Sequence, residues 1–231
     1  MNPIPTLVLP GLNGAAGMLS PFCEAAPATH HVAALDLPTN LSTYASMADH
    51  FDRRVAEGGA ALLVAESFSG PLAVMLAARH PSAVRAVVLA ASFVTSPMPS
   101  FARLLPWSLL LRVRVSSTAE RKSMLGDDCT ASQVEALRSA TRAVPVRTLA
   151  GRIRQMIDAD EADRLRRLTC PVVYLRAAAE RRIPDRCVEA IRHQARNPTV
   201  HTIDGPHLLL ENRPQAVWRH ILASIDQSTY R

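Results

Sequence analysis

Short runs of apolar residues alternate along the chain with longer amphipathic stretches. The runs are rich in valine, isoleucine and leucine, as is typical of strands buried on both faces of a parallel sheet. The predicted strands are Thr6–Leu9, Val32–Leu35, Ala60–Ala65, Val84–Ala91, Val172–Leu175 and Val200–Ile203. The predicted helices are Thr43–Glu57, Gly70–Arg79, Pro184–Ala195 and Pro214–Ile225. Repeated strand–helix–strand units of this kind predict a mostly parallel, doubly wound α/β sheet.

One interval interrupts this alternation. Between Ser96 and Thr169 the sequence contains no convincing strand and has the pattern of several helices. These predicted helices are Pro99–Val113, Thr118–Leu125, Ala131–Ala143 and Val146–Ile157. We therefore expect a core made of residues 1–95 and 170–231, interrupted by a helical insertion at residues 96–169.

Composition places the chain among globular proteins. Its 231 residues are 48% hydrophobic and 20% charged, which excludes global disorder and provides enough apolar material for one sizeable core. The longest apolar run, Ala86–Val94, is about half of a membrane span, so we expect no transmembrane helix. No basic segment precedes an apolar one near Met1, and we expect no signal peptide. These features favour a cytoplasmic protein.

The basic charge of the chain does not indicate a nucleic-acid ligand. The net charge is +6, and Lys122 is the only lysine among 26 basic residues. Such a bias toward arginine often reflects a GC-rich genome, and the arginines are not interleaved with aromatic residues as in a nucleic-acid groove. The cysteines lack the spacing of metal ligands and are expected to be buried free thiols. They are Cys23, Cys129, Cys170 and Cys187.

A predicted strand, a sharp turn and a predicted helix follow one another around Ser67. The residues two positions before and after it, Ala65 and Ser69, are both small. Small side chains are needed where a strand and a helix approach closely at a strained turn. Such a turn lifts the serine hydroxyl above the edge of the sheet, where a base can reach it. Ser69 is the alternative nucleophile, although its position past the turn is explained by the need for a small residue.

This arrangement resembles the nucleophile elbow of the α/β-hydrolase family. The usual family pattern is Gly-x-Ser-x-Gly, and this chain has Ala65-Glu66-Ser67-Phe68-Ser69, with both glycines replaced by small residues. The resemblance extends from Thr6 to Ile225 and is strongest to small bacterial hydrolases with a helical cap. It implies an α/β-hydrolase fold in which residues 96–169 cover the active site.

The resemblance also implies a catalytic triad in the chain order Ser67, Glu180, His207. His207 follows the last predicted strand, where a neutral imidazole can accept the serine proton and return it to a leaving group. Glu180 follows the preceding strand, at the position where similar proteins commonly have aspartate, and would orient the histidine. Asp185 and Asp204 are alternative acids, although helix capping and turn formation also explain them.

Two backbone N–H groups are implied as the oxyanion hole. They belong to Leu12, in the glycine-containing loop after the first strand, and to Phe68, directly after the nucleophile. Preorganised donors of this type contribute several kcal/mol to transition-state stabilisation. This chemistry needs no metal and no organic cofactor, and we expect neither.

The insertion suggests what the substrate is. Most of the apolar residues at its start are expected to form its own core, and Phe101 and Trp107 are candidates for contact with an acyl chain. Between Pro97 and Asp158 there are ten basic and five acidic residues. This charge predicts either a solvated surface or the steering of an anionic substrate.

The expected function is hydrolysis of a carboxylic ester through an acyl-enzyme on Ser67. One esterase of similar architecture removes a methyl ester from pimeloyl-acyl carrier protein, so an acidic acyl carrier protein is a candidate partner. Other activities on the same scaffold stay open, including thioesterase, lactonase, carbon–carbon bond hydrolase and cofactor-free haloperoxidase. A non-catalytic receptor on the same scaffold is a further alternative.

Overall fold

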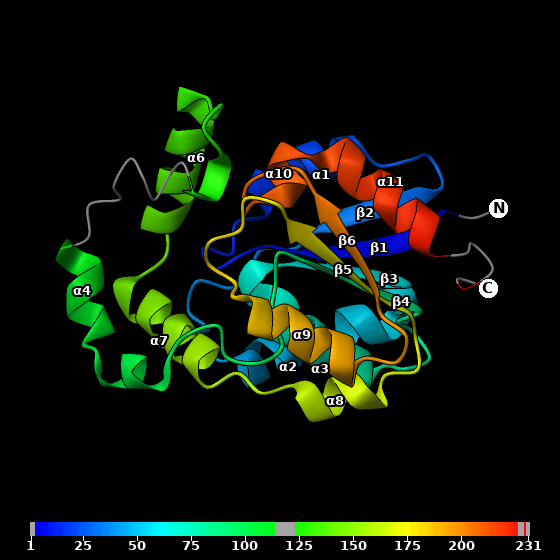
Figure 1. Ribbon diagram of the computed structural model, residues 1–231, viewed down its shortest axis with the longest axis horizontal. Helices are drawn as coiled ribbons and strands as arrows, with labels where there is room; N and C mark the ends of the chain where they lie inside the picture. The colour runs from blue at the N-terminus through cyan, green and yellow to red at the C-terminus, as the bar shows by residue number, and fades with distance from the viewer. Residues whose placement is uncertain (1–2, 114–122, 226–228, 230–231) are drawn as a thin grey trace.

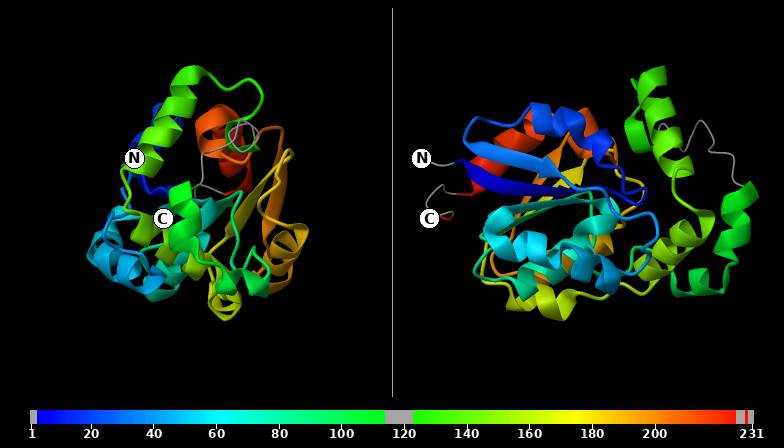
Figure 2. Two further views of the ribbon diagram at one scale, coloured as in Figure 1. Left: turned by 90° about the vertical axis from the view of Figure 1, so that its left-hand side faces the viewer. Right: turned by 180° about the vertical axis from the view of Figure 1, so that it is seen from behind.

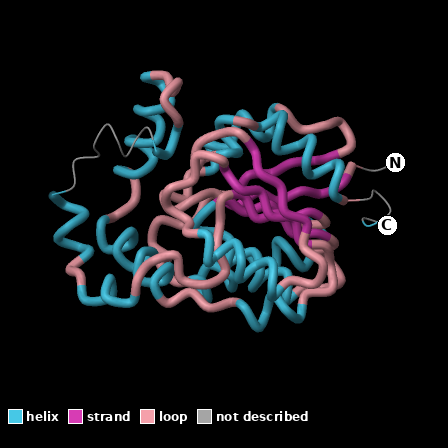
Figure 3. Tube along the Cα trace, viewed as in Figure 1, coloured by secondary structure: helices cyan, strands magenta, loops and turns pink. Residues whose placement is uncertain are grey.

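In the computed structural model, which describes residues 3–113, 123–225 and 229, a sheet of six parallel strands lies between two layers of helices (Figures 1 and 3). The spatial order of the strands is β2-β1-β3-β4-β5-β6. The strands are β1 (Ile4–Leu9), β2 (His30–Ala34), β3 (Leu62–Glu66), β4 (Ala86–Ala90), β5 (Val172–Ala177) and β6 (Thr199–Ile203). The predicted parallel α/β sheet is therefore confirmed, and its six strands lie where the apolar runs place them.

Helices cover both faces of this sheet (Figure 1). One face carries α1 (Ser20–Glu24), α10 (Leu209–Asn212) and α11 (Pro214–Ser224). The other face carries α2 (Tyr44–Arg54), α3 (Gly70–Arg79), α8 (Ala162–Arg167) and α9 (Asp185–Gln194). The short helices α1, α8 and α10 were not predicted, because four to six residues are too few to display a helical hydrophobic period.

Strand β3 shows why the apolar runs have so little polar alternation. Its side chains point alternately to opposite faces, and both faces are buried. Leu62 and Val64 join the core beneath α1 and α11, whereas Leu63 and Ala65 join the core beneath α2 and α3. A strand that is covered on both sides has no position for a solvated side chain, so its sequence is continuously apolar.

The helices of the insertion lie beyond the carboxyl ends of the strands, on the side of the molecule away from the two termini (Figures 1 and 2). They are the 3-10 turn η4 (Ser100–Leu104), α4 (Trp107–Val113), α6 (Ala131–Arg142) and α7 (Val146–Ile157). The prediction of one helix over Pro99–Val113 is wrong. The chain breaks at Leu105, whose backbone is extended, because the residue before a proline avoids the helical conformation.

The predicted helix Thr118–Leu125 is only partly described. Residues 123–125 are helical, and residues 118–122 lie outside the described part of the chain.

Several expectations from composition can be compared with the structure. The four cysteines are free thiols as expected, but only Cys187 is buried, so the expectation of burial is wrong for Cys23, Cys129 and Cys170, which are half-buried. Desolvation raises the pKa of Cys23, Cys170 and Cys187. Within the described ranges, every helix is too short or too polar to span a lipid bilayer.

Candidate active site

The turn after β3 holds Ser67 in an unusual backbone conformation. The φ angle of Ser67 is +50°, in the left-handed region that residues other than glycine rarely adopt. The surrounding structure fixes this conformation through two hydrogen bonds. Ser92 Oγ donates to the carbonyl of Ser67 at 2.5 Å, and the Tyr44 hydroxyl donates to the carbonyl of Phe68 at 2.8 Å. Strain of this kind persists only where neighbouring groups over-determine it, and it is typical of functional sites.

The neighbouring Ser69 has a different environment from Ser67. It is fully buried, and its hydroxyl donates to the carbonyl of Pro10 at 2.5 Å. Of the two serines, Ser67 lines the cavity that is described below. Ser69 joins the turn to the loop after β1 through its hydrogen bond.

Gly70 is the residue that allows the helix to pack closely after the turn. A Cβ atom at this position would lie 2.0 Å from Ser92 Oγ and 2.6 Å from the carbonyl oxygen of Phe93. The small residues predicted to be needed at this turn were Ala65 and Ser69, and Gly70 was not among them. The requirement for glycine is displaced by one residue from the usual family pattern.

Replacing Gly70 with alanine is expected to destabilise the fold by about 1–3 kcal/mol, because the added methyl group overpacks the junction of β4 with α3. Equilibrium unfolding in urea measures this difference. Gly17→Ala is a matched control, since no atom lies within 4 Å of the added Cβ there. Equal free energies of unfolding for the two variants would contradict the conclusion that the packing at this turn requires glycine at position 70.

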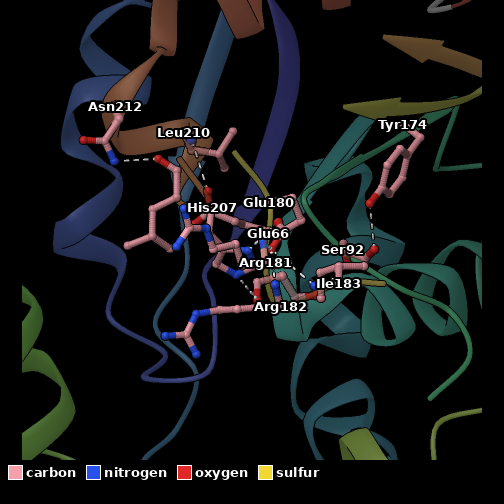
Figure 4. Close-up of polar contacts among 12 residues, drawn as sticks. Glu66, Ser92, Tyr174, Glu180, Arg181, Arg182, Ile183, His207, Leu210 and Asn212 are labelled. Atoms are coloured by element: carbon pink, nitrogen blue, oxygen red, sulfur yellow. Dashed lines mark hydrogen bonds and ion pairs between the residues drawn. The ribbon is translucent and has the colours of Figure 1, made fainter. Parts of the chain in front are cut away.

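Three side chains from distant parts of the sequence meet above this turn. The Ser67 hydroxyl lies 2.8 Å from His207 Nε2. His207 Nδ1 lies 2.7 Å from Glu180 Oε2, and Figure 4 shows these two side chains facing each other. The other oxygen of Glu180 accepts three backbone N–H groups at 2.9, 2.6 and 3.2 Å. These belong to Arg181, Arg182 and Ile183. The loop after β5 therefore holds the carboxylate rigidly against the imidazole.

The environment of Glu180 keeps it ionised. Burial alone would raise the pKa of this carboxyl group, but the hydrogen bond and charge of His207 and the N–H groups of Arg182 and Ile183 outweigh it and lower the pKa. An ionised carboxylate only accepts hydrogen bonds, so His207 Nδ1 carries the proton. This leaves Nε2 as the acceptor for the Ser67 hydroxyl. The arrangement is suited to removing the hydroxyl proton during nucleophilic attack.

The alternative acids lie elsewhere. Asp185 is the first residue of α9 and its carboxylate pairs with Arg176 at 2.6 Å. The N-cap of that helix is Pro184, so Asp185 is not a helix cap as the sequence suggested. Asp204 accepts a hydrogen bond from Arg213 through its backbone carbonyl. The structure brings Glu180, and neither aspartate, to His207.

The loop after β1 runs directly beside the serine. A Cβ atom on Gly11 would lie 3.8 Å from Ser67 Cβ, and Leu12 lines the cavity above the serine. The carbonyl of Gly11 accepts the N–H of Gly14 at 2.9 Å. Because a trans peptide directs its C=O and N–H groups to opposite sides, this bond turns the N–H of Leu12 away from Gly14. Phe68, the other predicted donor, is adjacent to Ser67, and its ring stacks on Tyr44.

Arg152 of α7 is completely buried beneath this loop. Arg152 is one of the ten basic residues expected on a solvated or steering surface, and for this residue that expectation is wrong. Its guanidinium donates to four backbone carbonyls, at 2.8, 2.9, 3.3 and 3.4 Å. They belong to Leu12, Pro38, Leu41 and Leu37. Burial lowers the pKa of Arg152 to about 10, so the side chain is still a cation at neutral pH.

A cavity of about 800 Å³ opens onto Ser67 and His207. Its wall is mostly apolar and comes largely from the insertion. These apolar lining residues include Met98, Trp107, Leu111, Leu137, Val144, Val146, Leu149 and Ile153. Three arginines also line it: Arg138, Arg142 and Arg182. Trp107 therefore lies at the cavity as expected, whereas Phe101 is 66% exposed and does not belong to the lining.

Two further carboxyl groups line this cavity. Glu66, directly before Ser67, is fully buried and accepts the N–H of Leu210 at 3.1 Å (Figure 4). Glu211 of α10 also lines the cavity, and among the described residues Oε2 of Glu66 and Oε2 of Glu211 are both buried without a hydrogen-bond partner. Burial and the charge of Glu211 raise the pKa of Glu66 well above its usual value, and burial raises that of Glu211 to about 7. Near neutral pH the pair therefore shares a proton.

This pair predicts a pH-dependent stability. Above pH 4.5 the unfolded chain releases protons that the folded pair retains, so the wild type loses stability as the pH rises from 4.5 toward about 7. Glu211→Gln removes part of this loss of stability. The unfolding free energy of the variant is expected to exceed that of the wild type, by an amount that grows from pH 4.5 to about pH 7. The gain is on the order of 2–3 kcal/mol.

Urea unfolding at several pH values measures this gain. The same change at the exposed Glu24 serves as a control. Parallel pH profiles for the wild type and Glu211→Gln would contradict the assignment of a shared proton.

Within the described ranges, no cluster of three histidine, cysteine, aspartate or glutamate side chains could hold a metal ion.

Comparison with known proteins identifies the fold. No protein-family model and no curated protein matches the sequence. Solved structures do match: an enol-lactonase from Burkholderia xenovorans LB400 superposes with a TM-score of 0.79 at 14% identity, covering 96% of this chain and 91% of the other. A thermophilic esterase from Thermogutta terrifontis gives a TM-score of 0.79 at 19% identity, covering 100% and 92%. MenH from S. aureus gives a TM-score of 0.79 at 13% sequence identity, covering 100% of this chain and 96% of MenH. The chain has the α/β-hydrolase fold.

Proposed function

We propose that the protein is a serine hydrolase that cleaves carboxylic esters through an acyl-enzyme on Ser67. The observation that carries this proposal is the continuous hydrogen-bonded chain from Ser67 through His207 to Glu180, with distances of 2.8 and 2.7 Å. The left-handed backbone at Ser67 and the glycine-containing loop beside it support the same assignment.

In the first half of this reaction, Ser67 Oγ attacks the ester carbonyl carbon while His207 Nε2 accepts the hydroxyl proton. The carbonyl oxygen becomes an oxyanion, which the N–H groups of Leu12 and Phe68 stabilise. Glu180 stabilises the imidazolium. The intermediate then collapses, the bond to the leaving alcohol breaks, and His207 donates its proton to that alcohol.

In the second half, a water molecule replaces the alcohol. His207 accepts one proton from the water as its oxygen attacks the acyl carbon. The second tetrahedral intermediate releases the carboxylic acid, and the proton returns to Ser67 Oγ. No atom of the protein is consumed, and each turnover converts one ester and one water into an acid and an alcohol.

We further propose that residues 1–95 and 170–231 form the catalytic core and that residues 96–169 form a cap that binds the acyl chain. The cavity of about 800 Å³ is large enough for a medium-length chain, and its apolar wall comes mainly from these helices. Trp107 is the proposed aromatic contact for the chain.

The arginines of the cavity favour an acyl group with an anionic end. Arg138 and Arg142 lie four residues apart on α6, and both line the cavity. An acyl chain attached to an acidic acyl carrier protein would have such an anionic end, as would a free dicarboxylic acid monoester. A thioester or lactone substrate uses the same chemistry and is the alternative to a simple ester.

A substrate panel tests these proposals. We expect hydrolysis of p-nitrophenyl esters with a preference for medium acyl chains, and faster turnover when the chain ends in a carboxylate or a carrier protein. Arg138→Gln/Arg142→Gln should remove that second preference only. Equal turnover of neutral and anionic esters would contradict the anionic substrate, and hydrolysis of neither esters nor thioesters nor lactones would favour a non-catalytic receptor.

A further inference from the structure

We propose that Arg152, although it lies on the insertion helix α7, is a positioning residue that limits rotation of the Leu12 N–H in the oxyanion hole. This inference rests on the proposed function, because it assigns a role within the same reaction. It starts from the backbone of the loop beside Ser67, where each of three consecutive carbonyl groups has its own donor.

The first two donors belong to the core. Ser69 Oγ donates to the carbonyl of Pro10, and the N–H of Gly14 donates to the carbonyl of Gly11. The third donor comes from the insertion: Arg152 Nη1 donates to the carbonyl of Leu12 at 2.8 Å. The peptide planes on both sides of Leu12 are therefore held, one by Gly14 and the other by Arg152.

A backbone N–H that stabilises an oxyanion is effective only if its direction is fixed before the reaction. The Leu12 N–H belongs to the peptide with the Gly11 carbonyl. Rotation of that plane would swing the N–H away from the position of the developing charge. The bond from Arg152 holds the next plane and so limits the rotation.

The packing around the guanidinium leaves it little freedom. A Cβ atom on Gly14 would lie 2.9 Å from Arg152 Nη1, and Gly14 has a φ of +76°. On its other side the guanidinium donates to the carbonyl of Pro38 at 2.9 Å. Arg152 thus joins the loop after β1 to the loop after β2, through charge-assisted bonds that are stronger than neutral ones.

The planar fork of arginine is what this site requires. The guanidinium presents several donors in one fixed plane, whereas a lysine ammonium is a point charge that reaches fewer carbonyls at once. Arg152→Lys keeps the charge and loses this geometry, and Arg152→Gln loses both.

The test measures ester hydrolysis per active site. The number of competent sites is counted by titration with a fluorophosphonate, which corrects for any fraction of unfolded protein. For both Arg152 variants we expect kcat per titrated site to fall about 10- to 100-fold, less than the loss of an entire oxyanion donor, with little change in KM. Arg154→Gln, an exposed position on the same helix, should leave kcat unchanged.

A second readout separates positioning from stability. A trifluoromethyl ketone forms a tetrahedral adduct whose oxyanion occupies the proposed hole, so its affinity should weaken by the same factor as kcat/KM. The affinity of the product carboxylic acid should not change. If Arg152→Gln does not fold, Arg152→Lys supplies both measurements.

The outcomes distinguish this inference from the proposed function. Wild-type protein that hydrolyses no ester contradicts the proposed function and, with it, this role. Active wild type with unchanged kcat per titrated site in Arg152→Lys contradicts only the role of Arg152. A lower number of titrated sites with unchanged kcat per site shows a purely structural arginine and also overturns the inference.

Discussion

Replacing Ser67 with alanine is expected to lower kcat for a p-nitrophenyl ester by about 10,000-fold or more. The change removes the atom that forms the acyl-enzyme and leaves His207 and Glu180 with nothing to activate. The residual rate would come from the oxyanion hole and from substrate binding alone. The fold should be retained, because the hydroxyls of Ser92 and Tyr44 hold the turn through the backbone carbonyls of residues 67 and 68, which the substitution leaves in place.

Ser69→Ala provides the comparison for this prediction. That change removes the hydrogen bond to the carbonyl of Pro10 and should reduce activity without abolishing it. Near-normal hydrolysis by Ser67→Ala, or its complete loss in Ser69→Ala alone, would show that the nucleophile has been assigned to the wrong serine.

Glu180→Gln is expected to lower kcat by about 1,000- to 10,000-fold. A neutral amide can donate a hydrogen bond to His207 Nδ1 and so stabilise the tautomer in which Nε2 carries the proton. That imidazole cannot accept the Ser67 proton. The amide also fails to stabilise the imidazolium that forms as Ser67 attacks. Initial rates with saturating ester measure the effect.

Asp185→Asn and Asp204→Asn are the matched controls, because they make the same chemical change at the two other acids that the sequence offered. The two ring nitrogens of His207 are bonded to Glu180 and Ser67 and to neither aspartate, and we expect kcat to change by less than about two-fold. If either aspartate variant were as slow as Glu180→Gln, the acid of the triad would have to be reassigned.

The fold could be predicted from the sequence because the sheet is buried on both faces. Burial of both faces makes the central strands β3, β4 and β5 largely apolar runs, which are visible without knowledge of the partners, whereas the edge strands β2 and β6 are only partly buried. β3 is the clearest example, since Leu62 to Glu66 are all buried. The helix break before Pro106 was missed because the apolar pattern continues across it, although the proline itself was a sufficient signal.

The part of the candidate site that could be predicted is the part that local sequence motifs indicate. Ser67, His207 and Glu180 each follow a recognisable strand, and parallel strands bring their carboxyl ends to one edge. Arg152 and the pair of Glu66 and Glu211 were not predicted as interacting groups. Their environments depend on contacts between segments far apart in the sequence, and no local pattern records those contacts.

A weaker signal for Arg152 was nevertheless present. Along α7 it shares the buried face with Thr148, Leu149 and Ile153. An arginine within the apolar stripe of an amphipathic helix must find acceptors inside the protein. Here those acceptors are backbone carbonyls of two loops. Every residue has a backbone carbonyl, so the sequence does not show which residues will be the partners.

The central claim is that Glu180 and His207 make the hydroxyl of Ser67 nucleophilic. Its most direct test is covalent labelling with a fluorophosphonate, followed by peptide mass spectrometry. We expect one adduct per chain, on Ser67, formed at least a hundred times more slowly in His207→Ala. An unlabelled wild-type protein, an adduct on another residue, or equal labelling rates with and without His207 would contradict the account.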